Sequence, residues 1–361
     1  MNRVYKVLGL MSGTSLDGLD IAYCNLWHTK EEKWDFKILE AKTIPYNLTW
    51  KSALKNAIQL SETAHSSLDI TYGKWLGEQA KTFIQKNSLQ VDFIASHGHT
   101  SHHRPEDGYT FQLGNGQELA NVSEQKVVCD FRTLDVSLSG QGAPLVPIGD
   151  ELLFSEYDFC LNLGGISNIS FKKNRKRIAY DIGLANMPLN YITQKIGLEF
   201  DEGGALAASG KLDEILLAQL DKLEYYKLPY PKSTGYEWFT KEIVPLIEKS
   251  NSPVSDLLHT FIHHNCSKIA AAVNTDRTKE NNTVLVCGGG ALNDYFSTTL
   301  SEKLNPYTKV IIPSKQLINF KEAVVFGLMG VLKIRKEVNV LSSVTGASKD
   351  SCSGIIFSPT K

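Results

Sequence analysis

The sequence predicts an α/β protein of two domains that arose by an internal duplication. At 361 residues the chain is too long for one ordinary hydrophobic core, and this length suits two domains. Each half opens with an apolar strand, a turn of small residues and a second apolar strand, at residues 9–23 and 159–173. Because this opening returns once, after a long interval, it indicates a duplication and not an array of short repeats.

The first half contains a meander of strands, then helices, then further strands. The meander is expected in three apolar runs joined by short turns, "YKVLGLM", "LDIAYCNL" and "FKILEAKTI". Helical stretches follow at about 49–60 and 65–87, the second with apolar residues at helical spacing. Three more strand-like runs come next, "VDFIASHG", "TFQLG" and "KVVCDF". The Gly- and Pro-rich loop at 137–147 marks a domain junction, so we expect an N-terminal domain over 1–135.

The second half repeats this order and is expected to form a C-terminal domain over 136–337. After its strand–turn–strand opening come the strand "RIAYDIG" and several helical stretches, at about 186–196, 212–222, 235–249 and 255–275. The segment "NTVLVCGGGALND" is a strand that ends in three glycines before a helix. The strand "KVIIP" and a helix over about 319–336 close the domain. The tail, 338–361, is expected to pack back on the N-terminal domain.

Charge and composition exclude several classes of function. With 38 basic and 39 acidic residues the net charge is −1, so no overall field favours a nucleic acid or an anionic membrane. The longest apolar run, 323–332, is too short to span a bilayer, and the N-terminus does not have the pattern of a signal peptide. Six cysteines are scattered without C-x-x-C spacing. They are expected to be reduced, which indicates a cytoplasmic protein.

The turn "SGTSLDG" at 12–18 has the residue types of a phosphate-binding turn. It offers backbone N–H groups, the hydroxyls of Thr14 and Ser15, and the carboxylate of Asp17. Successive N–H groups in a tight turn bind anions, and glycines let a phosphate approach the backbone closely. Asp17 could hold Mg²⁺ through water, because this ion prefers oxygen ligands and keeps much of its hydration. Taken alone, the stretch also fits an ordinary hairpin turn.

Two further glycine turns change that balance. "NLGGISN" at 162–168 is a second phosphate-compatible hairpin, and "VCGGGALN" at 286–293 is a strand-to-helix turn against which a nucleotide can lie. Each turn is weak evidence by itself. In this order and at these separations, the three describe the nucleotide cleft between the domains of sugar kinases, actin and Hsp70-type ATPases. It is not a Walker A site, since G-x-x-x-x-G-K-[ST] does not occur.

Candidates for substrate chemistry lie elsewhere in the chain. Asp181 is expected where an apolar strand ends, a position from which a carboxylate can act as a base, although a turn cap is equally compatible. Histidines in "SHGHTSHHRP" at 96–105 lack a nearby carboxylate or cysteine at ligand spacing, so sugar contacts are favoured over a metal. Arg132 follows a strand end and can pair with a carboxylate. The Pro-aromatic segment 225–235 by itself fits a surface loop.

Together these stretches resemble the anhydro-N-acetylmuramic acid kinase family. The motifs that carry the resemblance run in the family's order from about residue 7 to 347: "GLMSGTSLDGLDIA", "SHGHTSHHRP", "FQLGNG", "CDFRTLDVSLSGQGAPLVP", "LNLGGISNIS", "YDIG", "DEGGALAASGKLDE", "PKSTGYEWF", "VCGGGALN" and "SVTGA". "GQGAPLVP" and "PKSTG" are the most specific, because no general argument about nucleotide binding requires them. The resemblance implies a two-domain actin-like ATPase (duplicated ribonuclease H-like) fold.

It also implies an activity in peptidoglycan recycling. The family uses ATP with Mg²⁺ to open the 1,6-anhydro ring of anhydro-N-acetylmuramic acid and phosphorylate O6, which gives N-acetylmuramic acid 6-phosphate. By the resemblance Asp181 is the base that activates water, and Thr100, Arg132 and Glu322 lie by the sugar, with Arg132 suited to the lactyl carboxylate. The implied ATP-binding residues are Gly13, Thr14, Ser15, Asp17, Gly18, Asp20, Gly164, Gly165, Gly288, Gly289 and Gly290. A homodimer is usual for the family.

The sequence departs from the family beside the expected base. Where the family usually has a sequence close to D-T-G-P-G-N, this chain has "DIGLAN" at 181–186. Ile182 replaces a threonine, Leu184 and Ala185 replace Pro-Gly, and His99 stands where a glutamine is usual. Two alternatives to the family reaction therefore stay open: a kinase retuned to a related amino sugar, and a non-catalytic nucleotide-binding protein.

Overall fold

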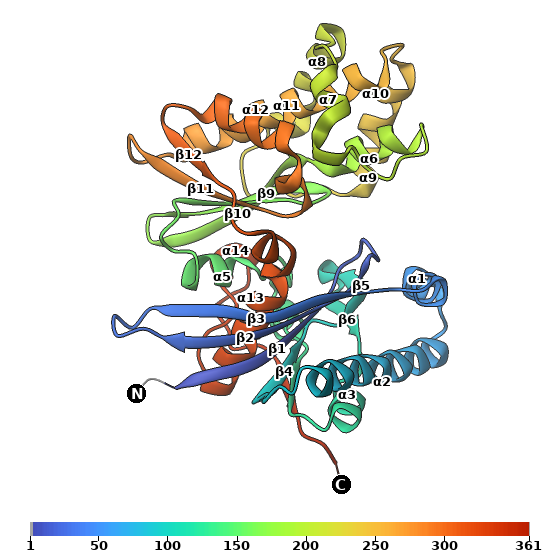
Figure 1. Ribbon diagram of the computed structural model, residues 1–361, viewed down its shortest axis with the longest axis vertical. Coiled ribbons are helices and arrows are strands. Elements are labelled where there is room, and N and C mark those ends of the chain that lie inside the picture. The colour runs from blue at the N-terminus through green and yellow to red at the C-terminus, as the bar shows by residue number, and fades with distance from the viewer. Residues whose placement is uncertain (1–2, 361) are drawn as a thin grey trace. The chain divides into compact units, whose positions relative to one another are not determined.

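The structure, a computed structural model, describes residues 3–360 and divides the chain into two compact units (Figure 1). Unit 1 runs to Leu153 and resumes at Phe320, and unit 2 is Phe154–Asn319. The helices of eight or more residues are α1 (Leu48–Lys55), α2 (Glu62–Lys86), α3 (Gly116–Ser123), α6 (Asn186–Gln194), α8 (Glu214–Asp221), α11 (Val254–Asp276), α12 (Asp294–Leu304) and α13 (Lys315–Arg335). The shorter ones are α4 (Thr133–Ser137), α5 (Pro147–Leu152), α7 (Ala205–Ser209), α9 (Tyr236–Trp238), α10 (Val244–Lys249) and α14 (Ser342–Thr345).

Unit 1 is built on a mixed sheet with the strand order β13-β7-β4-β1-β2-β3. Its strands are β1 (Val4–Ser12), β2 (Gly18–His28), β3 (Trp34–Pro45), β4 (Phe93–Ser96), β7 (Val127–Cys129) and β13 (Ile355–Phe357). β1, β2 and β3 form an antiparallel meander, whereas β4 and β7 continue parallel to β1, and β13 pairs antiparallel with β7. A separate two-stranded sheet joins β5 (His99–Arg104) and β6 (Tyr109–Leu113).

Helices cover both faces of the unit 1 sheet. Side chains alternate between the faces of a strand, and β1 shows this directly. Leu8 and Leu10 belong to the buried cluster that includes Tyr72 of α2. On the opposite face, Gly9 lies so close to the backbone of Ala323 on α13 that a Cβ at this position would collide with it. The missing side chain at Gly9 therefore allows α13 to pack against the strand that leads into the first glycine turn.

Unit 2 repeats the strand order of unit 1. Its sheet has the order β10-β9-β8-β11-β12, with β8 (Phe159–Leu163), β9 (Ile166–Lys173), β10 (Lys176–Leu184), β11 (Asn282–Cys287) and β12 (Thr308–Ile311). β8, β9 and β10 form an antiparallel meander, and β11 and β12 run parallel to β8. When the strands of each main sheet are counted along the chain, the third, second, first, fourth and fifth lie side by side in that order in both units. The expected duplication and the two-domain actin-like fold are confirmed.

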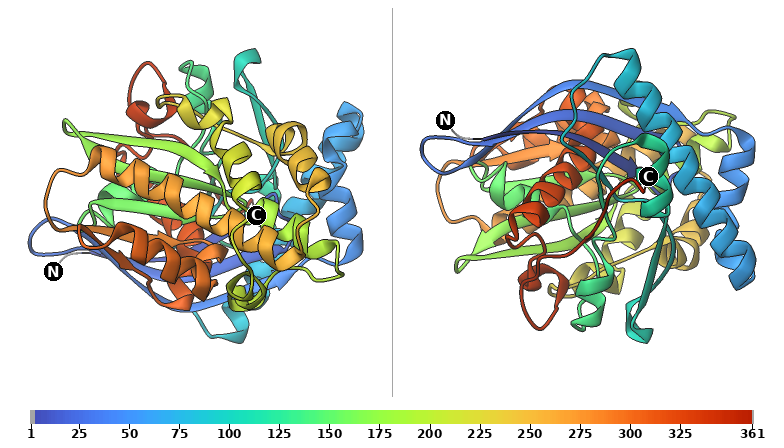
Figure 2. Two further views of the ribbon diagram at one scale, coloured as in Figure 1. Left: turned by 90° about the horizontal axis from the view of Figure 1, so that it is seen from above. Right: turned by 90° about the horizontal axis from the view of Figure 1, so that it is seen from below.

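The core of unit 2 lies between its sheet and its helices. One buried cluster joins sheet residues such as Leu161 and Val286 with Ile192 of α6, Phe261 of α11 and Phe296 of α12. Figure 2 shows α11 and α12, in orange, running along this sheet. None of the helices in the described part of the chain has both the length and the hydropathy needed to cross a membrane.

The units divide at other points than those expected from the sequence, which were 135/136 and 337/338. α5 and most of α13 belong to unit 1, because α13 packs on β1 at Gly9 and two contacts join α5 to α13. Lys321 Nζ donates to Asp150 Oδ1 at 2.6 Å in a buried ion pair. Gly149 packs so tightly on Val325 that no Cβ fits between them. The Gly- and Pro-rich loop that marked the composition shift therefore lies inside unit 1 and does not separate the units.

The helix expected over 235–249 is interrupted. α9 ends at Trp238, a π-helical turn covers Phe239–Ile243, and α10 begins at Val244. The cause lies in Pro245, which cannot donate a backbone hydrogen bond and whose ring collides with the carbonyl of a regular α-turn before it. The helix expected over about 49–60 is also shorter than predicted, because α1 ends at Lys55.

Candidate active site

The first predicted glycine turn is present as a tight hairpin between β1 and β2. Gly13 to Asp17 connect the strands, the Leu16 N–H donates to the Gly13 carbonyl at 3.3 Å, and Leu16 has a φ of 61°. Thr14, Ser15 and Asp17 are exposed. The hairpin therefore presents two hydroxyls and a carboxylate to solvent, as the phosphate-binding interpretation requires.

The two glycines of this hairpin lie in different surroundings. Gly18 is buried, and a Cβ there would collide with the backbone of Ile44 on β3, whose carbonyl carbon would lie at 2.9 Å. Gly13 meets nothing nearer than Ser15 Oγ, at 3.6 Å. The pairing of β2 with β3 thus requires glycine at 18 whatever the turn binds, whereas the space beside Gly13 is open to a ligand.

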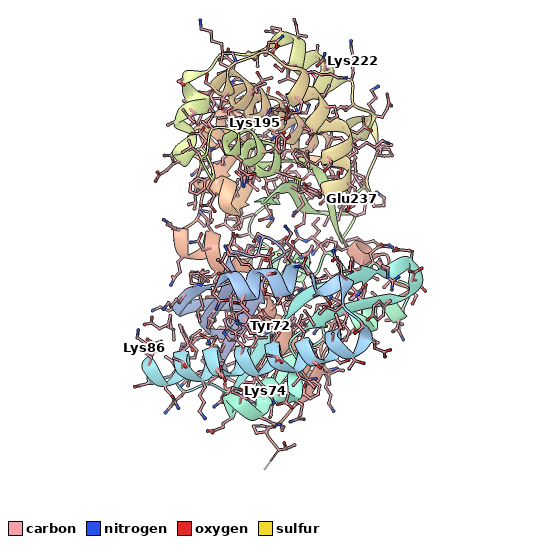
Figure 3. All side chains as sticks on the ribbon, turned by 90° about the vertical axis from the view of Figure 1, so that its right-hand side faces the viewer. Tyr72, Lys74, Lys86, Lys195, Lys222 and Glu237 are labelled. Atoms are coloured by element: carbon pink, nitrogen blue, oxygen red, sulfur yellow. The ribbon has the colours of Figure 1, made fainter. Side chains whose placement is uncertain are left out.

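Tyr46 holds both ends of the hairpin turn. Its backbone N–H donates to the carbonyl of Asp17 at 3.4 Å, and its hydroxyl donates to Ser12 Oγ at 2.7 Å. The hydroxyl of Tyr72 lies 2.6 Å from that of Tyr46. Tyr72 projects from α2 into the core, whereas Lys74 and Lys86 of the same helix are exposed (Figure 3). The turn is therefore connected to α2 through buried hydroxyl groups.

His99 continues this chain of hydrogen bonds. Its Nδ1 lies 2.9 Å from Ser12 Oγ, which already accepts a hydrogen bond from the Tyr46 hydroxyl. We therefore assign the Ser12 hydroxyl as the donor to Nδ1 and place the imidazole proton on Nε2. Burial lowers the pKa of His99 to about 4, so the ring stays neutral near pH 7. The histidine at the usual glutamine position is thus a neutral hydrogen-bonding group.

Arg132 is held by His97 and by a backbone carbonyl. Its Nε and Nη2 donate to His97 Nε2 at 3.1 and 2.8 Å, and its Nη1 donates to the carbonyl of Gly142 at 2.6 Å. Because an arginine cannot accept, the His97 proton is on Nδ1, which lies 2.9 Å from the Gly98 carbonyl. Burial and the charge of Arg132 hold the pKa of His97 well below its usual range. A neutral histidine therefore fixes the guanidinium.

Glu322 interacts electrostatically with this arginine and with a second carboxylate of unit 1, Asp20. Burial raises the pKa of Glu322, with the charge of Asp20 adding to the rise and that of Arg132 opposing it. Burial also raises the pKa of Asp20, although a hydrogen bond of 2.5 Å from Thr43 Oγ1 opposes this. A cation and two acids with raised pKa values therefore lie near the hairpin, as is common in sites that bind charged substrates.

The remaining sugar candidate, Thr100, lies on the hairpin of β5 and β6. Its Oγ1 is 3.5 Å from Gln112 Nε2, and it is only partly buried. The neighbouring histidines take part in side-chain hydrogen bonds, such as His103 Nδ1 to Thr110 Oγ1 at 3.2 Å. Within residues 3–360 no three His, Cys, Asp or Glu side chains form a group able to hold a metal ion. These side-chain hydrogen bonds show that the histidines help to hold the local structure.

In unit 2 the other two glycine turns lie together. The carbonyls of Gly164 and Gly165 accept from the backbone N–H groups of Asn186 and Ala185 at 3.0 and 2.9 Å, which ties this turn to the start of α6. Gly288 has a φ of 81°, and a Cβ there would lie 2.6 Å from Asn162 Oδ1. The phosphate-compatible hairpin and the turn against which a nucleotide can lie are thus neighbours within one unit.

Gly289 and Gly290 complete this turn in different ways. A Cβ at Gly290 would lie 2.7 Å from the Cβ of Leu163, so this glycine is required by packing. A Cβ at Gly289 would meet nothing nearer than the Asn186 side chain at 3.9 Å. Gly289 is therefore the member of the three beside which a ligand has room.

Asp181 lies inside β10 and not at its end, which corrects the sequence-based expectation. β10 continues to Leu184, with a break in the register against β9 between Asp181 and Gly183. Oδ2 of Asp181 accepts hydrogen bonds from Ser233 Oγ at 2.9 Å and from the Thr234 N–H at 3.0 Å. Burial raises the pKa of this carboxyl group, and the two hydrogen bonds oppose the rise. Burial thus makes this carboxylate a stronger proton acceptor than an exposed aspartate, as a catalytic base requires.

The three residues beside Asp181 that depart from the family pattern all face the core. Ile182, Leu184 and Ala185 are between 0 and 3% exposed and belong to the main cluster of unit 2. Gly183 is retained because Tyr226 leaves no room for a side chain, with its Cε1 2.6 Å from the position of a Cβ. The substitutions therefore change the packing behind Asp181, and the Asp181 carboxylate keeps its own hydrogen-bond partners.

The predicted residues fall into two sets. Unit 1 holds the hairpin turn, Asp20 and the three sugar candidates, and unit 2 holds Asp181 and the other two glycine turns. Ser233 and Thr234 were missed, because the segment 225–235 by itself fitted a surface loop. The signal that could have found them was "PKSTG", which no argument about nucleotide binding explains.

Known proteins of one family resemble this chain over nearly its whole length. The family model described as anhydro-N-acetylmuramic acid kinase matches residues 5–359. The chain is 33% identical to the anhydro-N-acetylmuramic acid kinase of Sulfurimonas denitrificans, over 97% of this chain and 98% of that protein. Its identity to that of Haemophilus influenzae is 33%, over 97% of both chains, and to that of Synechococcus elongatus 31%, over 98% and 100%. The resemblance found in the sequence is confirmed, and the chain belongs to the anhydro-N-acetylmuramic acid kinase family.

Proposed function

We propose that the protein is an ATP-dependent kinase that opens the 1,6-anhydro ring of anhydro-N-acetylmuramic acid and phosphorylates O6. The product is N-acetylmuramic acid 6-phosphate, an intermediate of peptidoglycan recycling. The family match over residues 5–359 supports this reaction. The observation that carries it in the structure is Asp181, a carboxylate with a raised pKa that accepts hydrogen bonds on one oxygen.

In the proposed reaction Asp181 takes a proton from water as the water oxygen attacks C1 of the sugar. The bond between C1 and O6 breaks, and its electron pair stays on O6. O6 then bonds to the γ-phosphorus of ATP, and ADP leaves. One base thus activates the nucleophile of the first step and thereby creates the acceptor of the second, and such proton transfer contributes on the order of 10² to 10⁴ in rate.

Unit 1 supplies groups that bind and orient charged parts of the substrates. The backbone N–H groups around Gly13, Thr14 and Ser15 are proposed to bind phosphate oxygens. Arg132 is proposed to bind the lactyl carboxylate, because His97 and Gly142 hold one guanidinium geometry and leave further N–H donors for a planar anion.

Unit 2 contributes two binding turns besides the base. Gly164 and Gly165 are proposed to contact the phosphates through their backbone, and Gly288, Gly289 and Gly290 to contact adenosine. The open side of Gly289 supports this assignment. In unit 1, Thr100 and Glu322 are proposed to bind sugar hydroxyls.

The hairpin turn has the donors for Mg²⁺. Asp17 is an exposed carboxylate close in the chain to the hydroxyls of Thr14 and Ser15, and this all-oxygen set suits an ion that keeps several waters. Asp17 would hold it through water, with Asp20 nearby. When bound, Mg²⁺ neutralises charge on the transferred phosphoryl group.

The two alternatives from the sequence gain no support. The substitutions at 182, 184 and 185 lie in the core, so they give no reason to expect a different sugar. A non-catalytic protein would not need a base with a raised pKa. We also propose a cytoplasmic homodimer, supported for the compartment by six free cysteines, five of them buried, and for the dimer by the family resemblance. Sedimentation velocity measures the oligomeric state.

The test is an assay of ADP release with ATP, Mg²⁺ and anhydro-N-acetylmuramic acid, run with the wild type and Asp181→Asn. The expected result is sugar-dependent ADP release by the wild type that falls at least a hundredfold in the variant. Mass spectrometry should show a product heavier than the sugar by water plus a phosphoryl group. ADP release that does not depend on the sugar, despite ATP binding, would refute the proposal.

A further inference from the structure

The segment from Tyr225 to Thr234 makes hydrogen bonds with every polar atom of Asp181 except Oδ1. The Asp181 N–H donates to the Lys232 carbonyl at 3.1 Å, and the Tyr225 hydroxyl donates to the Asp181 carbonyl at 2.7 Å. Oδ2 receives the two hydrogen bonds from Ser233 Oγ and the Thr234 N–H. The hydrogen bonds that the structure records on the carboxylate all fall on Oδ2, so the loop leaves Oδ1 for another partner.

The register break in β10 explains how one loop can reach this residue from several sides. Asp181 pairs with Asn168 and Gly183 with Ser167, so Ile182 is an extra residue on β10. Such a bulge locally removes ladder partners and redirects a side chain. Here the N–H of Asp181 bonds to the loop at Lys232.

Thr234 has a second polar group that the described chain does not satisfy. Its Oγ1 is buried and has no hydrogen-bond partner within residues 3–360. A hydroxyl left in this state costs free energy, so its retention needs a compensating partner. The N–H of the same residue binds Oδ2 of Asp181, so the unsatisfied hydroxyl belongs to a residue that contacts the proposed base.

We propose that Ser233 and Thr234 are positioning residues of the reaction: they fix Oδ2 of Asp181, so that Oδ1 takes the proton, and the Thr234 hydroxyl orients the attacking water. This inference rests on the proposed function, in which Asp181 is the base. The water proton moves to Oδ1, the water oxygen bonds to C1, and the bond from C1 to O6 breaks. Ser233 and Thr234 gain and lose no atoms in these steps.

The other titratable groups around Asp181 do not change charge where a carboxylate titrates. Burial and the charge of Asp181 raise the pKa of Tyr225. Burial and the neighbouring Lys268 of α11 lower the pKa of Lys232, whose Nζ donates to the Tyr225 carbonyl at 3.2 Å. Both start from values of 10 or above, and the Ser233 hydroxyl donates to Asp181, so a shift of the acid limb that is caused by a change at Ser233 reports on Asp181.

The first test replaces Ser233 by alanine, with Ser233→Thr as the matched control. Ser233 is exposed, so neither change threatens folding. Loss of one hydrogen bond to the ionised carboxylate raises its pKa, and the acid limb of kcat/KM should move up by about one pH unit. Ser233→Thr keeps a hydroxyl and should restore the wild-type profile. Titration of ¹³Cγ-labelled aspartate by NMR, assigned by its loss in Asp181→Asn, should show the same shift without turnover.

The second test separates the Thr234 hydroxyl from its backbone. Thr234→Val removes the hydroxyl and keeps the N–H, and kcat should fall about tenfold with little change in the KM of either substrate. Thr234→Ser should recover most of the rate. An unchanged acid limb and an unchanged Asp181 pKa in Ser233→Ala would overturn the positioning role even if the wild type is an active kinase. A wild type without sugar-dependent turnover would instead refute the proposed function, whatever the NMR titration shows.

Discussion

Removal of the Tyr46 hydroxyl is expected to weaken ATP binding without affecting sugar binding. In Tyr46→Phe the ring stays, so its contacts with Tyr72 and Trp75, at centroid distances of 6.4 and 5.5 Å, are kept. What is lost is the hydrogen bond to Ser12 Oγ, which holds the start of the hairpin turn, and the one from Tyr72. The backbone contact of Tyr46 with Asp17 at the other end of the turn remains.

The magnitude follows from these two buried hydrogen bonds. Each contributes about 1 kcal/mol, so the free energy of unfolding should fall by about 2 kcal/mol. If about half of this free energy is the cost of ordering a turn that is now more mobile before ATP binds, the Kd for ATP rises about fivefold. The KM for the sugar should change by less than twofold, because Arg132 is held by His97 and Gly142 and not by Tyr46.

The matched control is Tyr72→Phe, which removes only the bond at the far end of the chain and leaves Tyr46 bonded to Ser12. It should cost about 1 kcal/mol of stability and leave the Kd for ATP unchanged. Urea unfolding gives the stabilities, and titration calorimetry without sugar gives the Kd. Equal losses of ATP affinity in both variants, or no loss in Tyr46→Phe, would refute the reasoning.

Three further changes test other parts of the structure. Glu322→Gln should raise the free energy of unfolding at pH 7. Burial raises the folded pKa of Glu322 above 4.5, so ionisation of this group costs the wild type stability as the pH rises. Urea unfolding should therefore show a gain for the variant at pH 7 that vanishes below pH 4.5. Gly288→Ala should lower stability by about 2 kcal/mol, because its φ is 81° and its Cβ would meet Asn162, whereas Gly289→Ala should be nearly neutral; equal melting temperatures would contradict this. Arg132→Lys should raise the KM for the sugar about tenfold and leave that for ATP unchanged, since a lysine cannot replace the forked contact with His97; initial-rate kinetics decide, and an equal rise in both constants would count against it.

Local signals predicted much of the fold. The strand–turn–strand openings lie where they were expected, at β1–β2 and β8–β9, because apolar alternation and glycine turns act over a few neighbouring residues. The long helices α2 and α11 also follow their apolar spacing. The prediction of one continuous helix over 235–249 was wrong, because Pro245 cannot continue a regular α-helix.

The candidate site divides in the same way. Sequence alone singled out Asp181, Arg132 and the glycine turns, because residue type and chain position carry chemistry that can be recognised one segment at a time. It could not supply the partners that tune them. Ser233 lies 52 residues from Asp181, and His97 lies 35 residues from Arg132. Such contacts depend on where strands and loops meet after folding.

The sequence by itself therefore determined the family, the duplicated α/β architecture and the identity of the expected base. Only the tertiary structure decided that Gly18 serves the approach of β3, that the substitutions beside Asp181 face the core, and that a distant loop fixes one oxygen of its carboxylate. The physical reason is that type and periodicity are properties of neighbours along the chain, whereas burial and hydrogen-bond partners are properties of neighbours in space.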